Sequence, residues 1–131
     1  MKSIVLIARL LISLLGLALV VLGILFWTGH ALSLLQLHMT LGGLFVISMW
    51  ILVVVGLLAP GTRAFAILVF VWSLIVPAVG VTQVSLMPGA DHWVIQTVHL
   101  LIGLIAMGLA HALARRLGRR PAEAVAVSAS A

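Results

Sequence analysis

Long runs of apolar residues, separated by short clusters of glycine, proline and polar residues, divide this chain into four segments. The runs cover residues 4–27, 31–58, 64–87 and 92–114. Each is long enough to cross the hydrocarbon core of a bilayer, which takes roughly 20 helical residues. Backbone groups in lipid must bond within their own segment. The pattern therefore predicts an all-α fold, an integral membrane four-helix up-down-up-down bundle formed by residues 1–114.

Composition supports a lipid environment. The chain has 131 residues, of which 65% are hydrophobic, and its mean hydropathy is +1.42. A soluble domain of this size could not bury so much apolar surface. The first run is longer than a signal-peptide core and no A-x-A-like cleavage site follows it, so we expect an anchored span. The chain contains no cysteine, which excludes disulfides and thiolate chemistry.

The distribution of charge predicts the topology. A net charge of +5 would suggest a nucleic-acid partner in a soluble protein, but here every basic residue falls on one side of the four spans. This positive-inside pattern predicts a multi-pass protein of the bacterial inner (plasma) membrane with both termini in the cytoplasm, and no nucleic-acid partner. Arg9 is expected to snorkel to the headgroups. Residues 115–131 are expected to form a basic stop segment and a disordered cytoplasmic tail.

Two similar stretches, "QLHMTLGG" and "TVHLLIGL", each place a histidine four residues before a glycine. Sliding the sequence by 61 residues superposes His99 on His38 and Gly103 on Gly42. Two hairpins in the same orientation would be related by a pseudo-two-fold axis along the membrane normal. Equivalent positions would then face each other across the bundle.

The two histidines are also expected at the same depth. Each lies seven residues into its span, about 10 Å below the outer surface at 1.5 Å per residue. Their helices would be diagonal neighbours separated by about 12–14 Å, a gap that suits a metal between two imidazoles. Small residues one turn away leave clearance for a flat macrocycle, although they also serve ordinary helix packing. The inward-facing stripes are His38, Gly42, Phe45 and Met49 on the second helix, and His92, Gln96, His99, Gly103, Ala106 and Ala110 on the fourth.

Polar groups inside a membrane are costly, so intramembrane histidines indicate function. Either histidine alone would be expected simply to hydrogen-bond a carbonyl or Gln83. The matched pair favours joint ligation of one haem b iron by His38 and His99. Gln83 lies near the same depth and could bond a haem propionate, a histidine nitrogen or a quinone oxygen.

The remaining histidines have simpler explanations. His30 and His92 lie at the outer surface, either as ordinary loop residues, as donors to haem propionates, or, with Met87 and Asp91, as a copper or zinc site. His111 is expected at the inner interface. Its equivalent after the 61-residue shift is a tryptophan, so only one haem per chain is expected. The tryptophans are expected to form aromatic belts, with two at each surface: Trp27, Trp93, Trp50 and Trp72.

A four-helix membrane bundle with facing histidines on its second and fourth helices, each with a nearby glycine, resembles membrane b-type cytochromes of the cytochrome b561 kind and one half of haem A synthase. The resemblance implies a bis-histidine haem b. Proteins of the b561 kind carry a second histidine pair near the opposite surface, which this chain lacks. The synthase-like proteins pair their histidines with acidic residues, which are absent from these spans.

Together these features predict a membrane cytochrome with one haem b in the outer half of the bundle. Two imidazoles would fill both axial positions, which favours one-electron transfer over catalysis. The expected partners are the lipid bilayer, a quinone pool or membrane partner, and an outward-facing redox protein or larger complex. The alternatives are a non-redox accessory or assembly subunit of a membrane complex, and a periplasm-facing metal-handling protein.

Overall fold

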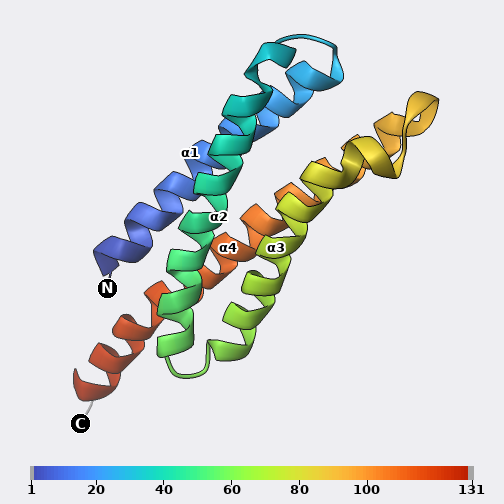
Figure 1. Cartoon of the computed structure of the whole chain (residues 1–131). Coiled ribbons are helices and arrows are strands. Elements are labelled where there is room, and N and C mark those ends of the chain that lie inside the picture. Colours follow the sequence, from blue (N-terminus) through green and yellow to red (C-terminus); the bar gives the residue numbers. More distant parts are fainter. Residues whose placement is uncertain (1, 130–131) are drawn as a thin grey trace.

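The computed structural model describes the backbone of residues 2–129 and the side chains of residues 2–119. Four long helices pack side by side as an up-down bundle (Figure 1). All four are long and apolar enough to cross a membrane. The predicted all-α up-down four-helix bundle with four candidate membrane spans is confirmed. The helices are α1 (Lys2–Trp27), α2 (Leu35–Leu58), α3 (Arg63–Leu86) and α4 (His92–Ala129), with short 3₁₀ helices η1 (Leu32–Leu34) and η2 (Gly89–Asp91).

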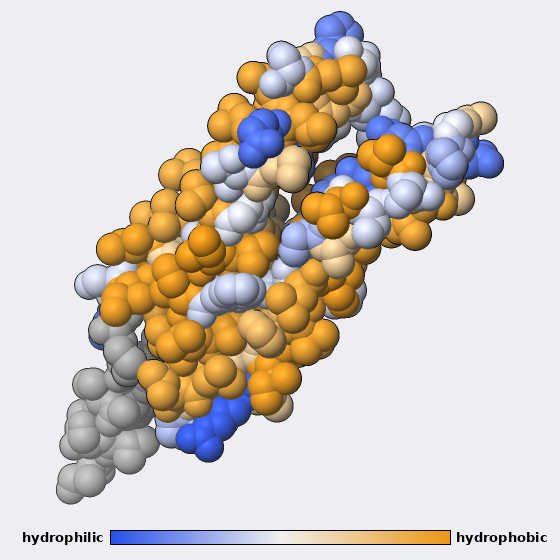
Figure 2. All heavy atoms as spheres, in the orientation of Figure 1, coloured by the Kyte–Doolittle hydropathy of each residue, from blue (hydrophilic) through white to orange (hydrophobic). Residues whose placement is uncertain are grey.

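The two ends of the bundle differ in charge. One end, here called the basic end, carries the N-terminus, the α2–α3 turn and the last part of α4 (Figure 1). The opposite end, here called the turn end, carries the α1–α2 and α3–α4 turns (Figure 1). Between them, the visible sides of the molecule are covered by apolar side chains (Figure 2). An apolar girdle between polar ends is the surface of a multi-pass membrane protein.

Helix α4 continues past residue 114, where the sequence suggested that the span ends. Its described backbone is helical as far as Ala129, through most of the segment expected to be disordered. Alanine-rich sequence has a high intrinsic helix propensity, which favours this continuation. The side chains from residue 120 onward, and residues 130–131 altogether, lie outside the described part of the chain.

The buried core occupies the part of the bundle nearer the basic end. Each helix packs on its neighbours in sequence, α1 closes the ring against α4, and α2 also touches α4 across the middle. This diagonal approach is closer than the separation expected from a square bundle. Small side chains on α4 allow it, because they let two backbones come together. The core cluster consists of Ala8, Ile12, Phe45, Val46, Met49, Leu52, Val53, Ala66, Val69, Ala106, Ala110, Leu113 and Ala114.

Towards the turn end, the two hairpins separate. The tips of α1–α2 and α3–α4 diverge in Figure 1, and the space-filling view shows a hollow between them (Figure 2). Leu22 and Ile95 are the buried apolar residues described in this half. On α3 the last buried residue is Ser73, and Pro77 follows one turn later. Proline removes one backbone hydrogen bond and allows a helix to bend. Pro77 lies at the level where α3 moves away from the buried core.

Two of the four tryptophans form hydrogen bonds between helices. Trp27 and Trp93 are exposed at the turn end, as expected. Trp50 instead donates its indole N–H to Ser73 Oγ at 2.9 Å, and Trp72 donates to the carbonyl of Ile102 at 3.0 Å. Trp50 lies eight residues before the end of α2, about 12 Å along the helix. A donor so far from water needs a protein acceptor, which explains both interhelical bonds.

Candidate functional site

His38 lies on α2 in the half of the bundle where the hairpins separate. Its side chain is half-buried, and its ring meets the ring of Phe26 on α1 edge-on, with centroids 5.4 Å apart and an interplanar angle of 64°. Phe26 belongs to the last turn of α1. The imidazole is therefore supported by its own hairpin, on the side away from α3.

His99 lies on α4 and is supported by α3. Its imidazole packs against the backbone of Gly80, where an added Cβ would lie 3.0 Å from His99 Cε1 and 3.5 Å from Nε2. Any side chain at position 80 would therefore press on the ring. Gly80 was not predicted as a site residue, because it does not follow a histidine at the four-residue spacing of Gly42 and Gly103. The sequence feature that could have indicated Gly80 is the "PAVG" stretch, in which a proline and a glycine interrupt the run of larger apolar residues.

The two predicted stripes are buried in the part nearer the basic end and half-buried at the histidines and their glycines. Phe45 and Met49, which continue the His38 face, are 3% and 0% exposed, and Ala106 and Ala110 on the His99 side are fully buried. The two histidines, one on each hairpin, lie within electrostatic range of each other. His38 thus contacts Phe26 of its own hairpin, and His99 contacts Gly80 of its own hairpin.

Both imidazoles carry a polar atom that the protein leaves unsatisfied. Nδ1 of His38 and Nδ1 of His99 are buried and have no hydrogen-bond partner. The Nε2 atoms are not among these buried atoms. A buried polar atom without a partner costs about 1–3 kcal/mol. Each of the two histidines therefore has one ring nitrogen whose bonding no described protein group completes.

The predicted clearance glycines both adjoin open space. An added Cβ at Gly103 would meet nothing within 4 Å, and one at Gly42 would only touch Leu19 Cδ2 at 4.0 Å. Gly16 on α1 behaves differently, because a Cβ there would lie 2.6 Å from Met107 Sδ. Gly16 therefore serves close packing between α1 and α4, whereas Gly42 and Gly103 flank the histidines with unfilled room.

Three further residues, predicted from the sequence to contact the ligand, lie near Gly80 or His99 along the chain. Gln83 follows Gly80 by one helical turn, and Gln96 precedes His99 by one turn. Both are half-buried, and neither side-chain amide has a hydrogen bond among the described residues. His92 is already engaged, because its Nδ1 donates to the Met87 carbonyl at 3.0 Å.

The surface histidines do not form a metal cluster. His30 is exposed and bonds Thr28 Oγ1 at 3.1 Å on the tip of the first hairpin. Over the described residues, no three histidine, aspartate or glutamate side chains gather into a group that could hold an ion. The copper or zinc site considered for His30, Met87, Asp91 and His92 thus gains no support from the geometry.

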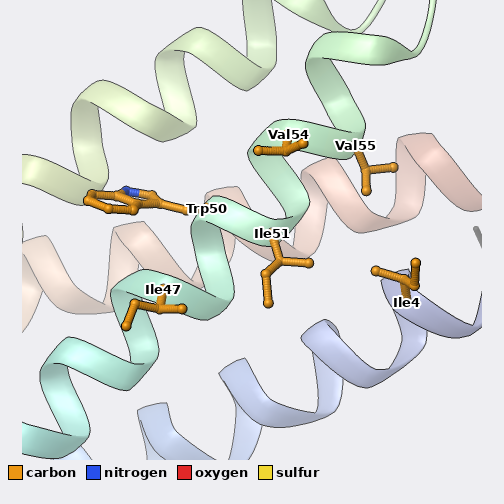
Figure 3. A pocket seen from close by; sticks show the side chains of 6 residues that line it. All are labelled: Ile4, Ile47, Trp50, Ile51, Val54 and Val55. Carbon is orange, nitrogen blue, oxygen red and sulfur yellow. The ribbon is translucent and has the colours of Figure 1, made fainter.

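Two hollows on the outside of the bundle are lined only by aliphatic and aromatic side chains. The first is lined by aliphatic residues and one indole, and Figure 3 shows these side chains around it on α1 and α2. The second lies on the other side of Trp50, between α2 and α3. Neither is lined by a titratable or metal-binding side chain, so they offer only dispersion contacts to lipid chains. The residues in Figure 3 are Ile4, Ile47, Trp50, Ile51, Val54 and Val55.

Two imidazoles on facing hairpins, with open room beside them, are a donor set that suits an iron ion needing two axial ligands. They could equally bind other imidazole-seeking metals, but a small ion would leave the adjoining room unfilled. Comparisons with known proteins add nothing to this choice. No family model, no curated protein and no solved structure matches the chain.

Proposed function

We propose that the protein is a membrane cytochrome that holds one haem b between His38 and His99 and exchanges single electrons. The observation that supports the proposal is that each of these histidines, one on each hairpin, has a buried Nδ1 atom with no hydrogen-bond partner among the described residues. Two histidines merely filling a core would be expected to bond each other, a carbonyl or Gln83. They bond none of these among the described residues.

The surroundings of the rings suit a large flat ligand. The core stops near Phe45 and Ala106, the hairpins part beyond it, and glycines at positions 42 and 103 leave the adjoining space open (Figure 2). A packed bundle would fill such a space with side chains, because a void forfeits dispersion contacts. A macrocycle between the hairpins would supply those contacts.

Each residue of the site has a role in this proposal. His38 and His99 would hold the haem iron, while the contacts with Phe26 and Gly80 would orient their rings. Gln83 and Gln96 are placed to bond polar groups at the edge of the ligand. The haem would supply a one-electron couple, and two occupied axial positions leave no site for oxygen or substrate. Electron transfer, and not catalysis at the metal, is the activity expected.

The proposal includes a cellular setting. The basic end faces the cytoplasm of a bacterial inner membrane, and the haem lies in the half of the bundle near the outer surface. A single haem on one side exchanges electrons within that side, with a quinol or quinone in the membrane and an outward-facing redox partner. The proposed pseudo-two-fold relation between the hairpins would put His38 and His99 at equal depth.

Haem content tests the proposal directly. We expect purified protein to show a sharp reduced-state absorption band and one haem per chain in a pyridine haemochrome assay against protein concentration. We expect only one haem per chain because His111, the remaining intramembrane histidine, bonds Ser13 Oγ and has a tryptophan, not a histidine, as its equivalent after the 61-residue shift. A ratio near two would mean that His111 also ligates. Colourless protein would favour the non-redox accessory subunit instead.

Topology is testable with single cysteines, because the native chain has none. The structure selects exposed positions: Ser33 and Ala90 at the turn end and Pro60 at the basic end. Gly29, with φ +77°, and Thr62, which is 2% exposed, would be poor choices. In whole cells we expect an impermeant thiol reagent to label positions 33 and 90 and not position 60. Labelling of position 60 from outside would contradict the proposed orientation.

A further inference from the structure

A polar and positively charged seam runs between α1 and α4 towards the basic end. Ser13 Oγ and His111 Nε2 lie 3.3 Å apart across the two helices. Ser13 Oγ also donates to the carbonyl of Arg9 at 3.1 Å. The guanidinium groups of Arg9 and Arg115 both lie within electrostatic range of the His111 ring. One serine, one histidine and two arginines therefore gather on one face.

The register of the two helices places the arginines opposite each other. Helices α1 and α4 run antiparallel, and the Ser13–His111 contact fixes their alignment. One turn towards the basic end from that contact comes Arg9 on α1 and Arg115 on α4. Residues four apart on a helix share a face. The two guanidinium groups thus emerge from the same level of the seam.

This level coincides with the end of the apolar spans. The side chain of Leu113 lies 3.1 Å from a Cβ added at Gly56, two residues before α2 ends. The guanidinium of Arg116 lies 3.8 Å from the ring centroid of Phe65, two residues after α3 begins. Arg115 lies between Leu113 and Arg116 in sequence. The Arg9–Arg115 pair therefore lies where lipid headgroups meet the protein.

Arg9 and Arg115 have no protein partner among the described side chains, in contrast to Arg63 and Arg116. Arg63 donates its Nε–H to the carbonyl of Leu57 at 3.0 Å, and Arg116 covers Phe65. Arg9 and Arg115 are exposed and have no hydrogen bond or ion pair among the described side chains. Facing like charges repel unless an anion lies between them. Arginine forks match the oxygens of a phosphate, and they bind it with charge-assisted hydrogen bonds.

We propose that Arg9, His111 and Arg115 form a binding site for the phosphate group of an anionic phospholipid in the leaflet at the basic end. The guanidinium groups bind the phosphate oxygens, and His111 lies one turn deeper, behind them. Inorganic phosphate shares this chemistry, but apolar side chains are exposed on both helices beyond the seam and provide contact for acyl chains. Basic sites between membrane helices are typical positions for anionic lipids. This proposal does not depend on the haem.

The test measures lipid affinity by native mass spectrometry of the full-length protein in mild detergent. The probes are phosphatidylglycerol and phosphatidylcholine with identical chains. We expect one tightly held phosphatidylglycerol in wild type. R9Q and R115Q should each weaken it about fivefold, the contribution typical of one arginine near an anionic surface. R115K keeps the charge and should bind more tightly than R115Q.

R63Q is the matched control, because Arg63 lies at the same end but bonds the Leu57 carbonyl. It should leave the affinity unchanged, and added inorganic phosphate should not displace the lipid. If R63Q weakened lipid binding as much as R9Q and R115Q do, the lipid would be held by general charge attraction, and the proposed site would be wrong. Equal binding of phosphatidylcholine would also contradict the site. Displacement by inorganic phosphate would overturn the assignment to a lipid. Thermal unfolding of each variant checks that the bundle remains folded.

Discussion

Replacing either His38 or His99 with alanine is expected to abolish stable low-spin haem. Each substitution removes one axial ligand and leaves iron with an empty position inside an apolar gap. The measurement is the reduced-minus-oxidised spectrum of purified variants, together with the haem-to-protein ratio. Because the protein leaves both Nδ1 atoms without partners, neither variant breaks a hydrogen bond of the fold. The bundle should therefore remain folded while the spectrum is lost.

The other histidines provide the controls for this experiment. H30A and H92A remove bonds to Thr28 and to the Met87 carbonyl at the turn end. H111A removes the contact with Ser13, far from the hollow between the hairpins. All three should keep the wild-type spectrum. If H38A and H99A also keep it, the two histidines would be packing residues and the cytochrome proposal would be wrong.

Much of the architecture follows from the sequence because it depends on local pattern. The four spans were predictable from unbroken apolar runs, since lipid leaves only the helix as a way to satisfy the backbone. The inward direction of His38 and His99 follows from helical periodicity, and the burial of Met49 and Ala106 agrees with it. These predictions needed no knowledge of how the helices meet.

What the sequence could not supply depends on contacts between helices. Gly80 supports His99 only because α3 and α4 pack with that register, which no periodicity in α3 reveals. The close α2–α4 approach and the splaying of the hairpins likewise arise from side-chain sizes on several helices at once. Trp72 appeared to be a belt residue because its acceptor is a backbone carbonyl, at Ile102, that sequence does not mark.

The glycines permit a test of whether a ligand fills the hollow. G42L and G103L are expected to reduce haem loading severely, at least as much as loss of an axial histidine reduces it. An added Cβ at Gly103 meets nothing within 4 Å, and one at Gly42 meets only Leu19 Cδ2 at 4.0 Å, so neither position is tightly packed against another helix. Reduced loading in a variant that folds and unfolds like wild type would therefore report an occupant of that space.

Gly43 offers the matched control for this series. It adjoins Gly42 in sequence but is exposed, and a Cβ there meets nothing within 4 Å. G43L should leave haem loading unchanged, because a step of one residue turns the side chain about 100° around the helix. Gly16 would be a poor control, since a leucine there would collide with Met107 and disturb the α1–α4 contact.

A leucine at position 80 would affect haem binding indirectly, by displacing the His99 ring and not by occupying the space of the haem. A leucine at position 80 must push the His99 ring aside, because even its Cβ would lie 3.0 Å from Cε1. We expect haem loss similar to that of H99A, whereas G80A should shift the spectrum with smaller loss, since a few tenths of an ångström of ring movement can accommodate one methyl group. Full haem loading in G42L, G103L and G80L alike would mean that the haem does not bind between the hairpins. Loss of haem in G80L alone would mean that haem binding needs the ring of His99 but not the space beside Gly42 and Gly103.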